Sequence, residues 1–431
     1  MTLSILLFTI ITFLACSIAT HRRYDGYKLV RTIPDMDDDL DSLRILKDMY
    51  EGEEVDFWNG IKRLGMPVDI AVSPQMEATL IALLEDFGLR STIVITDIQA
   101  LIDDQMRPSL STRVKRDADS TNEFDYNVYH PLGEINNWVN DIAAEYPNIA
   151  TKIKIGASYK KRNILALKIG RASPTGDSKP VAWFQAGIHA REWISPASII
   201  FVTHKLLSGY GSDNEITALL DGLDIYIIPV LNVDGYAYTW TNDRLWRKTR
   251  SENSDSMCVG VDANRNYDLH WGDADGADVN PCNETYRGTE ATSEEEIKAV
   301  TRYMQGVVDS GDTIRLFIDF HSYGQVWMAP WGYTEDPSDD FEDQNNLQAD
   351  AVEALTAVHG TNYTYGQISQ TMYKASGCSV DWAYGALGVL YSYTIELPDT
   401  GDFGFTLPPE RIESTVTELF EGLKVALNHI L

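Results

Sequence analysis

Short apolar runs alternate with helical patterns along most of the chain after residue 130. The runs are of strand length and do not alternate with polar residues, which is typical of strands buried on both faces. They occupy residues 181–187, 223–232, 314–321 and 389–397. Helical patterns occupy residues 131–147, 195–209 and 410–431, and a strand pair is predicted at 151–158 and 164–170. The order predicts an α/β domain with a mixed, mostly buried central sheet and helices on both faces.

The preceding segment, residues 24 to about 110, has shorter elements and predicts a small α+β unit with a ferredoxin-like arrangement. Strand patterns fall at residues 27–33, 68–74 and 91–98, and helical patterns fall at 38–50 and 76–89. Each helical pattern lies between two strand patterns. We therefore expect a separate domain in front of the larger one.

A basic cluster separates the two units. Arg113, Lys115 and Arg116 lie in a polar stretch of the type that proteases cut. A solvated run of charges would be the alternative. If Arg116 is the cleavage point, residues 20–116 form an N-terminal propeptide and residues 117–431 form the main domain.

The extreme N-terminus is apolar and uncharged from Leu3 to Ala19 and predicts a cleaved signal peptide, residues 1–19. The stretch lacks a basic n-region, so a signal anchor is the alternative. No later stretch has the length or hydropathy to span a membrane. We therefore expect a secreted, extracellular protein without a membrane anchor once the signal is removed.

Composition narrows the choice of partners and compartment. The 431 residues carry a net charge of −29, which argues against nucleic acid and anionic membranes as partners. Of the four cysteines, Cys16 leaves with the signal, and Cys258 and Cys282 are close enough in sequence to form a disulfide in an oxidising compartment. Cys378 is then a free thiol.

Polar side chains follow three of the predicted core strands. His189 and Glu192 come directly after the strand at 181–187, His321 ends the strand at 314–321, and Glu396 lies at the end of the strand at 389–397. Ligand sites in open α/β sheets form beyond the carboxyl ends of strands. Two imidazoles and one carboxylate are the protein ligands of many catalytic zinc sites. His189, Glu192 and His321 are therefore candidate ligands of one Zn²⁺ ion.

Several motifs, in one order, resemble those of the pancreatic-type zinc metallocarboxypeptidases, the carboxypeptidase A/B family. They are HAREW at 189–193, RLWRKTR at 244–250, CVGVDANRNYD at 258–268, IDFHSYGQ at 318–325 and TIELPDTG at 394–401. Residues 24–110, with VDFW at 55–58, resemble that family's activation segment. The resemblance implies a zymogen that a protease activates, and an enzyme that removes the C-terminal residue of peptides. We expect a monomer.

The resemblance also implies roles for individual residues. Glu396 is the candidate general base, Arg247 stabilises the oxyanion, and Asp262 holds the first histidine ligand. Asn264, Arg265 and Tyr373 are expected to bind the terminal carboxylate of the substrate, because an arginine fork matches a carboxylate with two hydrogen bonds. Further substrate-binding positions are Arg191, Arg244, Ser322 and Tyr323.

One pocket position decides the preferred C-terminal residue in this family, and Val380 occupies it here. Its neighbours in the pocket are also uncharged: Gly332, Ile368, Met372, Ala375 and Thr394. An apolar pocket predicts carboxypeptidase A-like preference for aromatic or aliphatic residues. Asp381 would favour basic residues, as in carboxypeptidase B, if the alignment shifted by one. Cys378 departs from the small residue, such as glycine, that the family usually has there.

Two other functions compete with this interpretation. A secreted binding protein could keep the fold and lose catalysis, but the candidate ligands, Arg247 and Glu396 are all present. An endopeptidase could use the same metal chemistry, but Asn264 and Arg265 favour a chain terminus as substrate.

Overall fold

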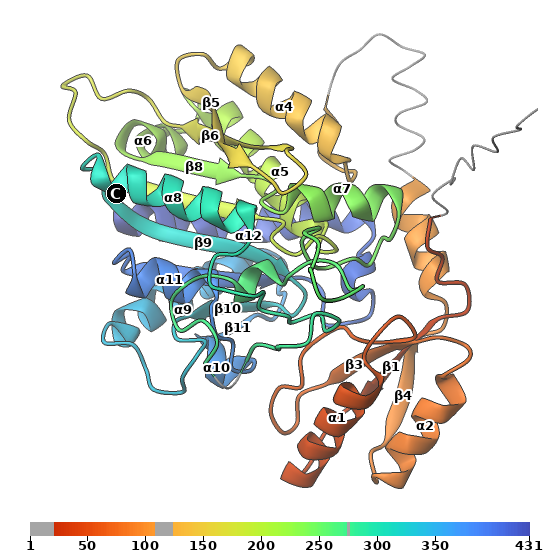
Figure 1. The fold of residues 1–431 in the computed structure, drawn as a ribbon. Helices are drawn as coiled ribbons and strands as arrows, with labels where there is room; N and C mark the ends of the chain where they lie inside the picture. Colours follow the sequence, from red (N-terminus) through yellow and green to blue (C-terminus); the bar gives the residue numbers. More distant parts are fainter. Residues whose placement is uncertain (1–20, 108–123, 274–275) are drawn as a thin grey trace, which may run out of the picture.

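The computed structural model describes residues 21–107, 124–273 and 276–431 (Figure 1). They form an N-terminal domain, residues 21–107, and a larger C-terminal domain, residues 124–431, each with a sheet of its own. The predicted signal segment and Arg116 lie outside the described residues. The two sheets agree with the predicted order of a small α+β unit before an α/β domain.

The N-terminal domain is a four-stranded antiparallel sheet in the order β2-β3-β1-β4, covered by two helices (Figure 1). Leucines of both helices pack on Val30, Ile70 and Val72 of the sheet. The predicted strands and helices are confirmed, whereas β2 and a helix over residues 98–107 were not predicted. The elements are β1 (Lys28–Thr32), α1 (Asp37–Tyr50), β2 (Val55–Phe57), β3 (Val68–Val72), α2 (Glu77–Asp86) and β4 (Ser91–Ile95).

The C-terminal domain is built on a mixed eight-stranded sheet in the order β11-β10-β12-β9-β7-β8-β6-β5. The four neighbours β12, β9, β7 and β8 run parallel, and antiparallel pairs occur on either side of them. Every residue of β7 is buried, as its continuous apolar run predicts. The strands are β5 (Ala150–Ala157), β6 (Asn163–Ile169), β7 (Val181–Ala186), β8 (Asp224–Ile228), β9 (Ile314–Ser322), β10 (Val326–Ala329), β11 (Thr364–Gln367) and β12 (Tyr391–Leu397).

Helices cover both faces of this sheet, which confirms the predicted fold (Figure 1). On one side α12 packs against both α5 and α9. On the other side Tyr303 of α8 contacts Trp183, and Ser379 of α11 contacts Asp319. The helices are α4 (Leu132–Glu145), α5 (Ile194–Gly209), α6 (Asn214–Gly222), α7 (Val233–Thr241), α8 (Glu295–Asp309), α9 (Phe341–His359), α10 (Ile368–Thr371), α11 (Ser379–Gly385) and α12 (Ile412–Ile430).

The predicted disulfide between Cys258 and Cys282 is confirmed, with 5.0 Å between their Cα atoms. It closes a loop of the C-terminal domain in a segment with little regular structure. Cys378 is the free cysteine among the described residues and is buried.

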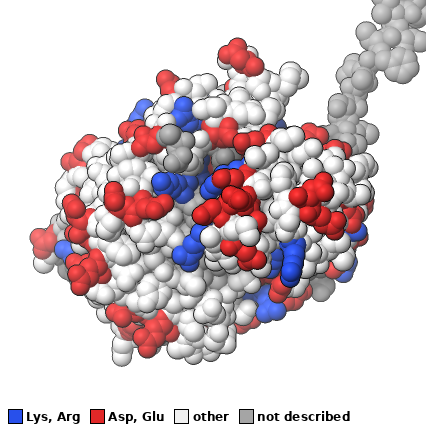
Figure 2. Space-filling view, turned by 90° about the horizontal axis from the view of Figure 1, so that it is seen from below, with Lys and Arg blue, Asp and Glu red and all other residues white. Residues whose placement is uncertain are grey.

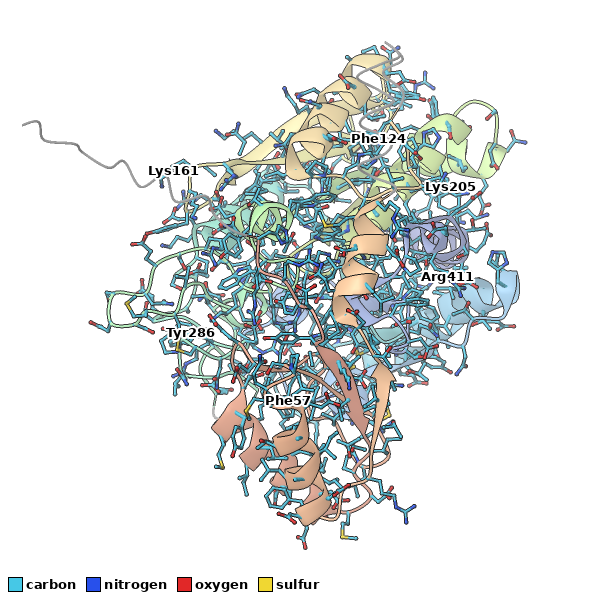
Figure 3. All side chains as sticks on the ribbon, turned by 90° about the vertical axis from the view of Figure 1, so that its right-hand side faces the viewer. Phe57, Phe124, Lys161, Lys205, Tyr286 and Arg411 are labelled. Carbon is cyan, nitrogen blue, oxygen red and sulfur yellow. A yellow bond between two sulfur atoms is a disulfide. The ribbon has the colours of Figure 1, made fainter. Side chains whose placement is uncertain are left out.

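The helical residues 98–107 follow the N-terminal sheet and run along the C-terminal domain (Figure 3). Gln105 is buried there, and its amide donates to the carbonyl of Leu407 over 2.9 Å. Its side-chain oxygen accepts a bond of 2.8 Å from the guanidinium of Arg244. Phe57 of the N-terminal domain also lies where the two domains meet (Figure 3). The N-terminal domain is thus held to the C-terminal domain by buried polar contacts.

Candidate metal centre and substrate cleft

A tight turn after β7 places the first two candidate ligands. Gly187 has φ +65°, a conformation that glycine adopts without steric cost, and a Cβ there would lie 3.3 Å from Val230 Cα. The chain therefore turns sharply out of the sheet and enters α5 seven residues later. His189 and Glu192 lie in that short connection, at the carboxyl edge of the sheet.

The other two candidates reach the same edge from the neighbouring parallel strands. In the register of β12 and β9, Glu396 pairs directly with His321. Both strands run in the direction of β7, so their carboxyl ends meet at one edge. The structure therefore brings together the four residues that the strand ends predicted.

The three candidate ligands form a compact, buried cluster. Their ligand atoms lie within 4.8 Å of one another, and each residue is at most 4% exposed. His189 Nδ1 is 2.7 Å from Glu192 Oε1 and 3.1 Å from His321 Nδ1, and His321 Nδ1 is 3.2 Å from Glu192 Oε2. Both histidines thus direct Nδ1 into the cluster.

The chemistry of these donor atoms fits a zinc ion. Two imidazole nitrogens and one carboxylate converge, which is a common three-residue set of catalytic zinc sites. The backbone N–H of Ser322 donates to Glu192 Oε2 over 3.2 Å and helps to orient that carboxylate. With three protein ligands, a zinc site keeps a position for water or substrate.

Asp262 contacts the nitrogen of the His189 ring that faces away from the metal cluster. Its Oδ1 is 3.0 Å from His189 Nε2, and its Oδ2 accepts a bond of 2.8 Å from Arg247 Nη2. Burial acts to raise the pKa of Asp262, but the charges of Arg247, His189 and Arg265 outweigh it and hold the pKa well below its usual range. The aspartate therefore stays ionised and accepts the proton of His189 Nε2.

A small pocket opens beside the cluster, with a cavity volume of about 40 Å³. Asn264, Arg265 and Tyr373 line it together with His189, His321 and Glu396, and the remaining lining is uncharged. Those residues are Met328, Ile368, Met372, Ala375, Cys378, Val380 and Thr394. Burial raises the pKa of the Glu396 carboxyl to about 7.

Asp381 lies behind this pocket. It is fully buried, its Oδ1 accepts the N–H of Gly332 over 2.9 Å, and its Oδ2 accepts that of Tyr333 over 3.1 Å. It is absent from the residues that line the cavity, whereas Val380 is among them. In this structure Val380, and not Asp381, therefore lines the pocket beside the metal cluster.

Comparison with known families agrees with this site. Residues 135–422 match the family described as zinc carboxypeptidase, and residues 31–105 match the carboxypeptidase activation peptide. The chain belongs to the zinc carboxypeptidase family. It is therefore a zinc-dependent metallocarboxypeptidase, a hydrolase that acts on peptide C-termini, and its N-terminal domain is the activation segment of a zymogen that requires a protease.

Similar proteins cover nearly the whole chain. Carboxypeptidase A1 of Bos taurus is 40% identical over 94% of each chain, and carboxypeptidase A5 of Macaca fascicularis is 39% identical over 95% of this chain and 91% of its own. The solved structure of thrombin activatable fibrinolysis inhibitor has a TM-score of 0.84 at 33% identity and covers 94% of this chain and 99% of its own. Carboxypeptidase A from Helicoverpa armigera has a TM-score of 0.83 at 26% identity, over 95% of this chain and 98% of its own.

The activation segment contacts two predicted substrate-binding residues and borders a cavity that lies between the domains. Arg191 Nη1 donates to Asp56 over 2.9 Å, and the hydroxyl of Tyr323 donates to Asp69 over 2.8 Å. A cavity of about 730 Å³ remains between the domains, lined by both, with Arg247 and Arg265 in its wall. Viewed from below, Lys and Arg side chains gather around a hollow on this face of an otherwise acidic protein (Figure 2).

The predicted substrate-binding residue Arg244 has a different environment. It is fully buried, its guanidinium lies 3.8 Å from the centre of the Trp193 ring, and it donates to the carbonyls of Arg191 and Phe405. It is absent from the lining of the pocket and of the cavity between the domains. In the uncut chain Arg244 thus bonds both to the backbone of the C-terminal domain and to Gln105 of the activation segment.

One buried carboxylate of the site was not predicted. Asp319 lies two residues before His321 on β9 and is fully buried beside it. The sequence holds a signal that could have revealed it, because residues two apart on a strand point to the same face. An acidic residue is unexpected in a continuous apolar strand, on the same face as a metal ligand, unless it has a polar partner.

Proposed function

We propose that this zymogen is secreted and, once activated, removes aromatic and aliphatic residues from peptide C-termini. The observation that carries the specificity is the uncharged lining of the pocket around Val380, with both oxygens of Asp381 held by backbone N–H groups behind it. A Lys or Arg side chain would lose its hydration there without a counter-ion. An apolar side chain would instead bury its surface, at about 25 cal/mol per Å².

Catalysis is assigned to residues around the metal cluster. His189, Glu192 and His321 would hold one zinc ion, and the chemistry that the ion would supply is that of a Lewis acid for the scissile carbonyl and for water. Glu396 accepts the proton of the attacking water and returns it to the leaving nitrogen. Arg247, whose guanidinium faces the cluster, stabilises the negative charge that develops on the carbonyl oxygen.

Recognition of a chain terminus is assigned to three polar residues that line the pocket. Arg265 and Asn264 bind the free carboxylate of the substrate, and Tyr373, which lines the same pocket, also contacts it. Arg191, Tyr323, Ser322 and Arg244 contribute to the more distant substrate positions. This arrangement favours an exopeptidase over an endopeptidase, because an internal peptide has no carboxylate to fill the site.

Secretion and activation complete the proposal. Residues 1–19 are assigned as a cleaved signal, residues 20–116 as the propeptide and residues 117–431 as the enzyme, a monomer without a membrane anchor. Among the described residues, no helix is both long and apolar enough to cross a bilayer. The disulfide between Cys258 and Cys282 suits an oxidising compartment.

The deciding experiment measures which residue is released. The secreted protein is cut with trypsin, the new N-terminus is sequenced, and release of Leu, Phe, Lys and Arg from otherwise identical peptides is compared. We expect Asp117 as the new N-terminus, faster release of Leu and Phe, and loss of activity with a zinc chelator that added zinc reverses. Faster release of Lys or Arg would establish the carboxypeptidase B-like alternative, and no release after activation would indicate an inactive binding homologue.

A further inference from the structure

Both histidines of the metal cluster have a carboxylate on the side that faces away from it. His189 directs Nδ1 into the cluster, and its Nε2 lies 3.0 Å from Asp262 Oδ1. His321 also directs Nδ1 into the cluster, and its Nε2 lies 3.4 Å from Asp319 Oδ2. Asp319 on β9 is therefore placed behind His321 as Asp262 is placed behind His189.

Asp319 is held in place by donors that carry no charge. Its Oδ2 accepts a bond of 2.6 Å from the hydroxyl of Ser379 and one of 2.9 Å from the amide of Gln185. Its Oδ1 has no hydrogen-bond partner among the described residues, and the side chain is fully buried. A buried carboxylate is costly unless a positive charge or sufficient hydrogen bonds compensate it.

The position of the His321 proton explains why a carboxylate is useful there. If Nδ1 of a neutral imidazole binds a metal, its single proton must be on Nε2, and that N–H needs an acceptor. Besides Asp319, Asn264 Nδ2 lies 3.5 Å from His321 Nε2. The Asn264 oxygen accepts the N–H of Ser379 over 2.9 Å, so the amide directs its donor group toward His321 and cannot accept the proton. Asp319 is then the acceptor.

We propose that Asp319 is a positioning residue for zinc, which fixes the tautomer and ring orientation of His321 and adds a negative charge beside the dication. The inference rests on the proposed ligand set. Partners of this kind behind a metal-ligating histidine typically change metal affinity by about 10- to 100-fold. Asp319 also connects the metal cluster to the first residue of α11, Ser379, which precedes Val380 of the substrate pocket.

The test measures zinc binding by the uncut, full-length protein, without substrate. The zinc Kd is determined by competition with a chromophoric chelator for the wild type, Asp319→Ala and Asp319→Asn. We expect affinity to fall by about 10- to 100-fold in the alanine variant. The asparagine variant should lie between, because its side-chain oxygen still accepts the His321 proton but carries no charge. The visible absorption of the Co²⁺-substituted protein should change most in the alanine variant and less in the asparagine variant, relative to the wild type.

The matched control is Asp234→Asn. Asp234 is also a buried aspartate that accepts two hydrogen bonds, from Lys160 N and from Arg162, but it contacts none of the candidate ligands. That variant should lose thermal stability without any change in zinc Kd. A second, milder variant, Ser379→Ala, keeps the carboxylate and should weaken zinc binding less than Asp319→Ala.

The outcomes separate positioning from a purely structural role. Bound zinc stabilises the folded state according to its affinity, so the zinc-induced rise in Tm should be smaller in both Asp319 variants. If these variants lower the Tm of the zinc-free protein but leave the zinc-induced rise, the Kd and the Co²⁺ spectrum unchanged, the inference is wrong. If the wild type itself binds no zinc, the proposed ligand set fails instead.

Discussion

Gly60 of the activation segment lies directly against the ring of Tyr373. A Cβ atom at Gly60 would be 2.5 Å from Tyr373 Cε1 and 2.7 Å from Cδ1, closer than side-chain atoms approach one another. Tyr373 also lines the substrate pocket. The activation segment thus contacts a proposed substrate-binding residue at a point where its own chain has no side chain.

This contact predicts that Gly60→Ala loosens the zymogen. The added methyl group forces either the Tyr373 ring or the loop to move, at a cost of about 1–3 kcal/mol. The affinity of the cut activation segment for the enzyme should fall roughly 5- to 150-fold, and the uncut chain should become more active on a small peptide. Gly52→Ala is the control, because a Cβ there meets no atom within 4 Å. Equal behaviour of the two variants would contradict the prediction.

The same interface should respond to pH through Glu51. Its side chain is 2% exposed, lies 3.6 Å from Lys47 Nζ and has no hydrogen-bond partner among the described residues. Burial raises the pKa of Glu51 from 4.5 to about 7, Lys47 and Arg191 act to lower it, and Asp56 and Glu284 act to raise it. A carboxyl whose pKa is raised in the folded state stabilises that state below its unfolded pKa, and this contribution is lost as pH rises.

We therefore expect the cut activation segment to bind the enzyme more tightly at pH 4.5 than at pH 7. One pKa unit corresponds to about 1.4 kcal/mol, so the Glu51 contribution is on the order of 3 kcal/mol across this range. Glu51→Gln cannot ionise and should give a flatter profile. The measurement is the Kd of the separated segment at several pH values for both forms. If the Kd of the wild-type segment and that of the Glu51→Gln segment change with pH in the same way, groups other than Glu51 cause the pH dependence.

The buried core could be predicted from the sequence, because strands covered on both faces leave continuous apolar runs. The ligands His189, Glu192 and His321 could be predicted for a related reason, since polar residues directly after such runs must lie at the edge of the sheet. The short strands β2 and β10 could not, because three or four residues offer too few positions to establish a period of two. These two strands form because neighbouring strands of the sheet pair with them.

The strand pattern could have revealed Asp319 as a buried charge beside His321, but its partners could not be predicted, because they are distant in the sequence. In the sequence it is one charge within an apolar strand, and Gln185 and Ser379 lie far from it along the chain. Arg244 illustrates the converse. Its motif predicts a substrate contact, but only the structure shows the partners in the activation segment that bury it in the uncut chain. Local patterns locate elements and metal ligands, whereas supporting contacts depend on tertiary packing.

Glu396→Gln tests the assignment of the general base. The amide has the same shape but cannot accept a proton from water, so kcat of the activated enzyme should fall by about 10²- to 10⁴-fold. Bound zinc should stay at one per chain, because Glu396 is not among the three clustered ligands. Rates are measured on a peptide with C-terminal Phe, and metal content is measured on the same sample. Near-normal kcat in the variant would remove Glu396 from this role.

Val380→Asp tests the pocket position that sets the class of substrate. A carboxylate at this buried site would supply the counter-ion that Lys and Arg side chains lack, so the ratio of kcat/KM for Lys over Leu should rise. Release of Leu should fall in the same variant, because the new charge loses hydration beside an apolar side chain. Asp381→Asn is the comparison: both oxygens of Asp381 are bound by the backbone, and this change should cost stability without a gain for basic residues. The prediction fails if the wild type prefers Lys or Arg and Asp381→Asn loses that cleavage. Asp381 would then be the residue in the pocket.

Cys378 should set the size limit of that pocket. It is buried in the pocket lining, and its Sγ lies 3.2 Å from where a Cβ at Gly332 would be, so the two segments are closely packed. Cys378→Gly removes the thiol and should admit larger side chains, which raises the ratio of kcat/KM for Phe over Leu by about tenfold or more. Cys378→Ser keeps nearly the same size and should leave the ratio close to that of the wild type. If the serine variant shifts the ratio as far as the glycine variant does, polarity and not size explains the effect; if neither shifts it, Cys378 does not limit the pocket.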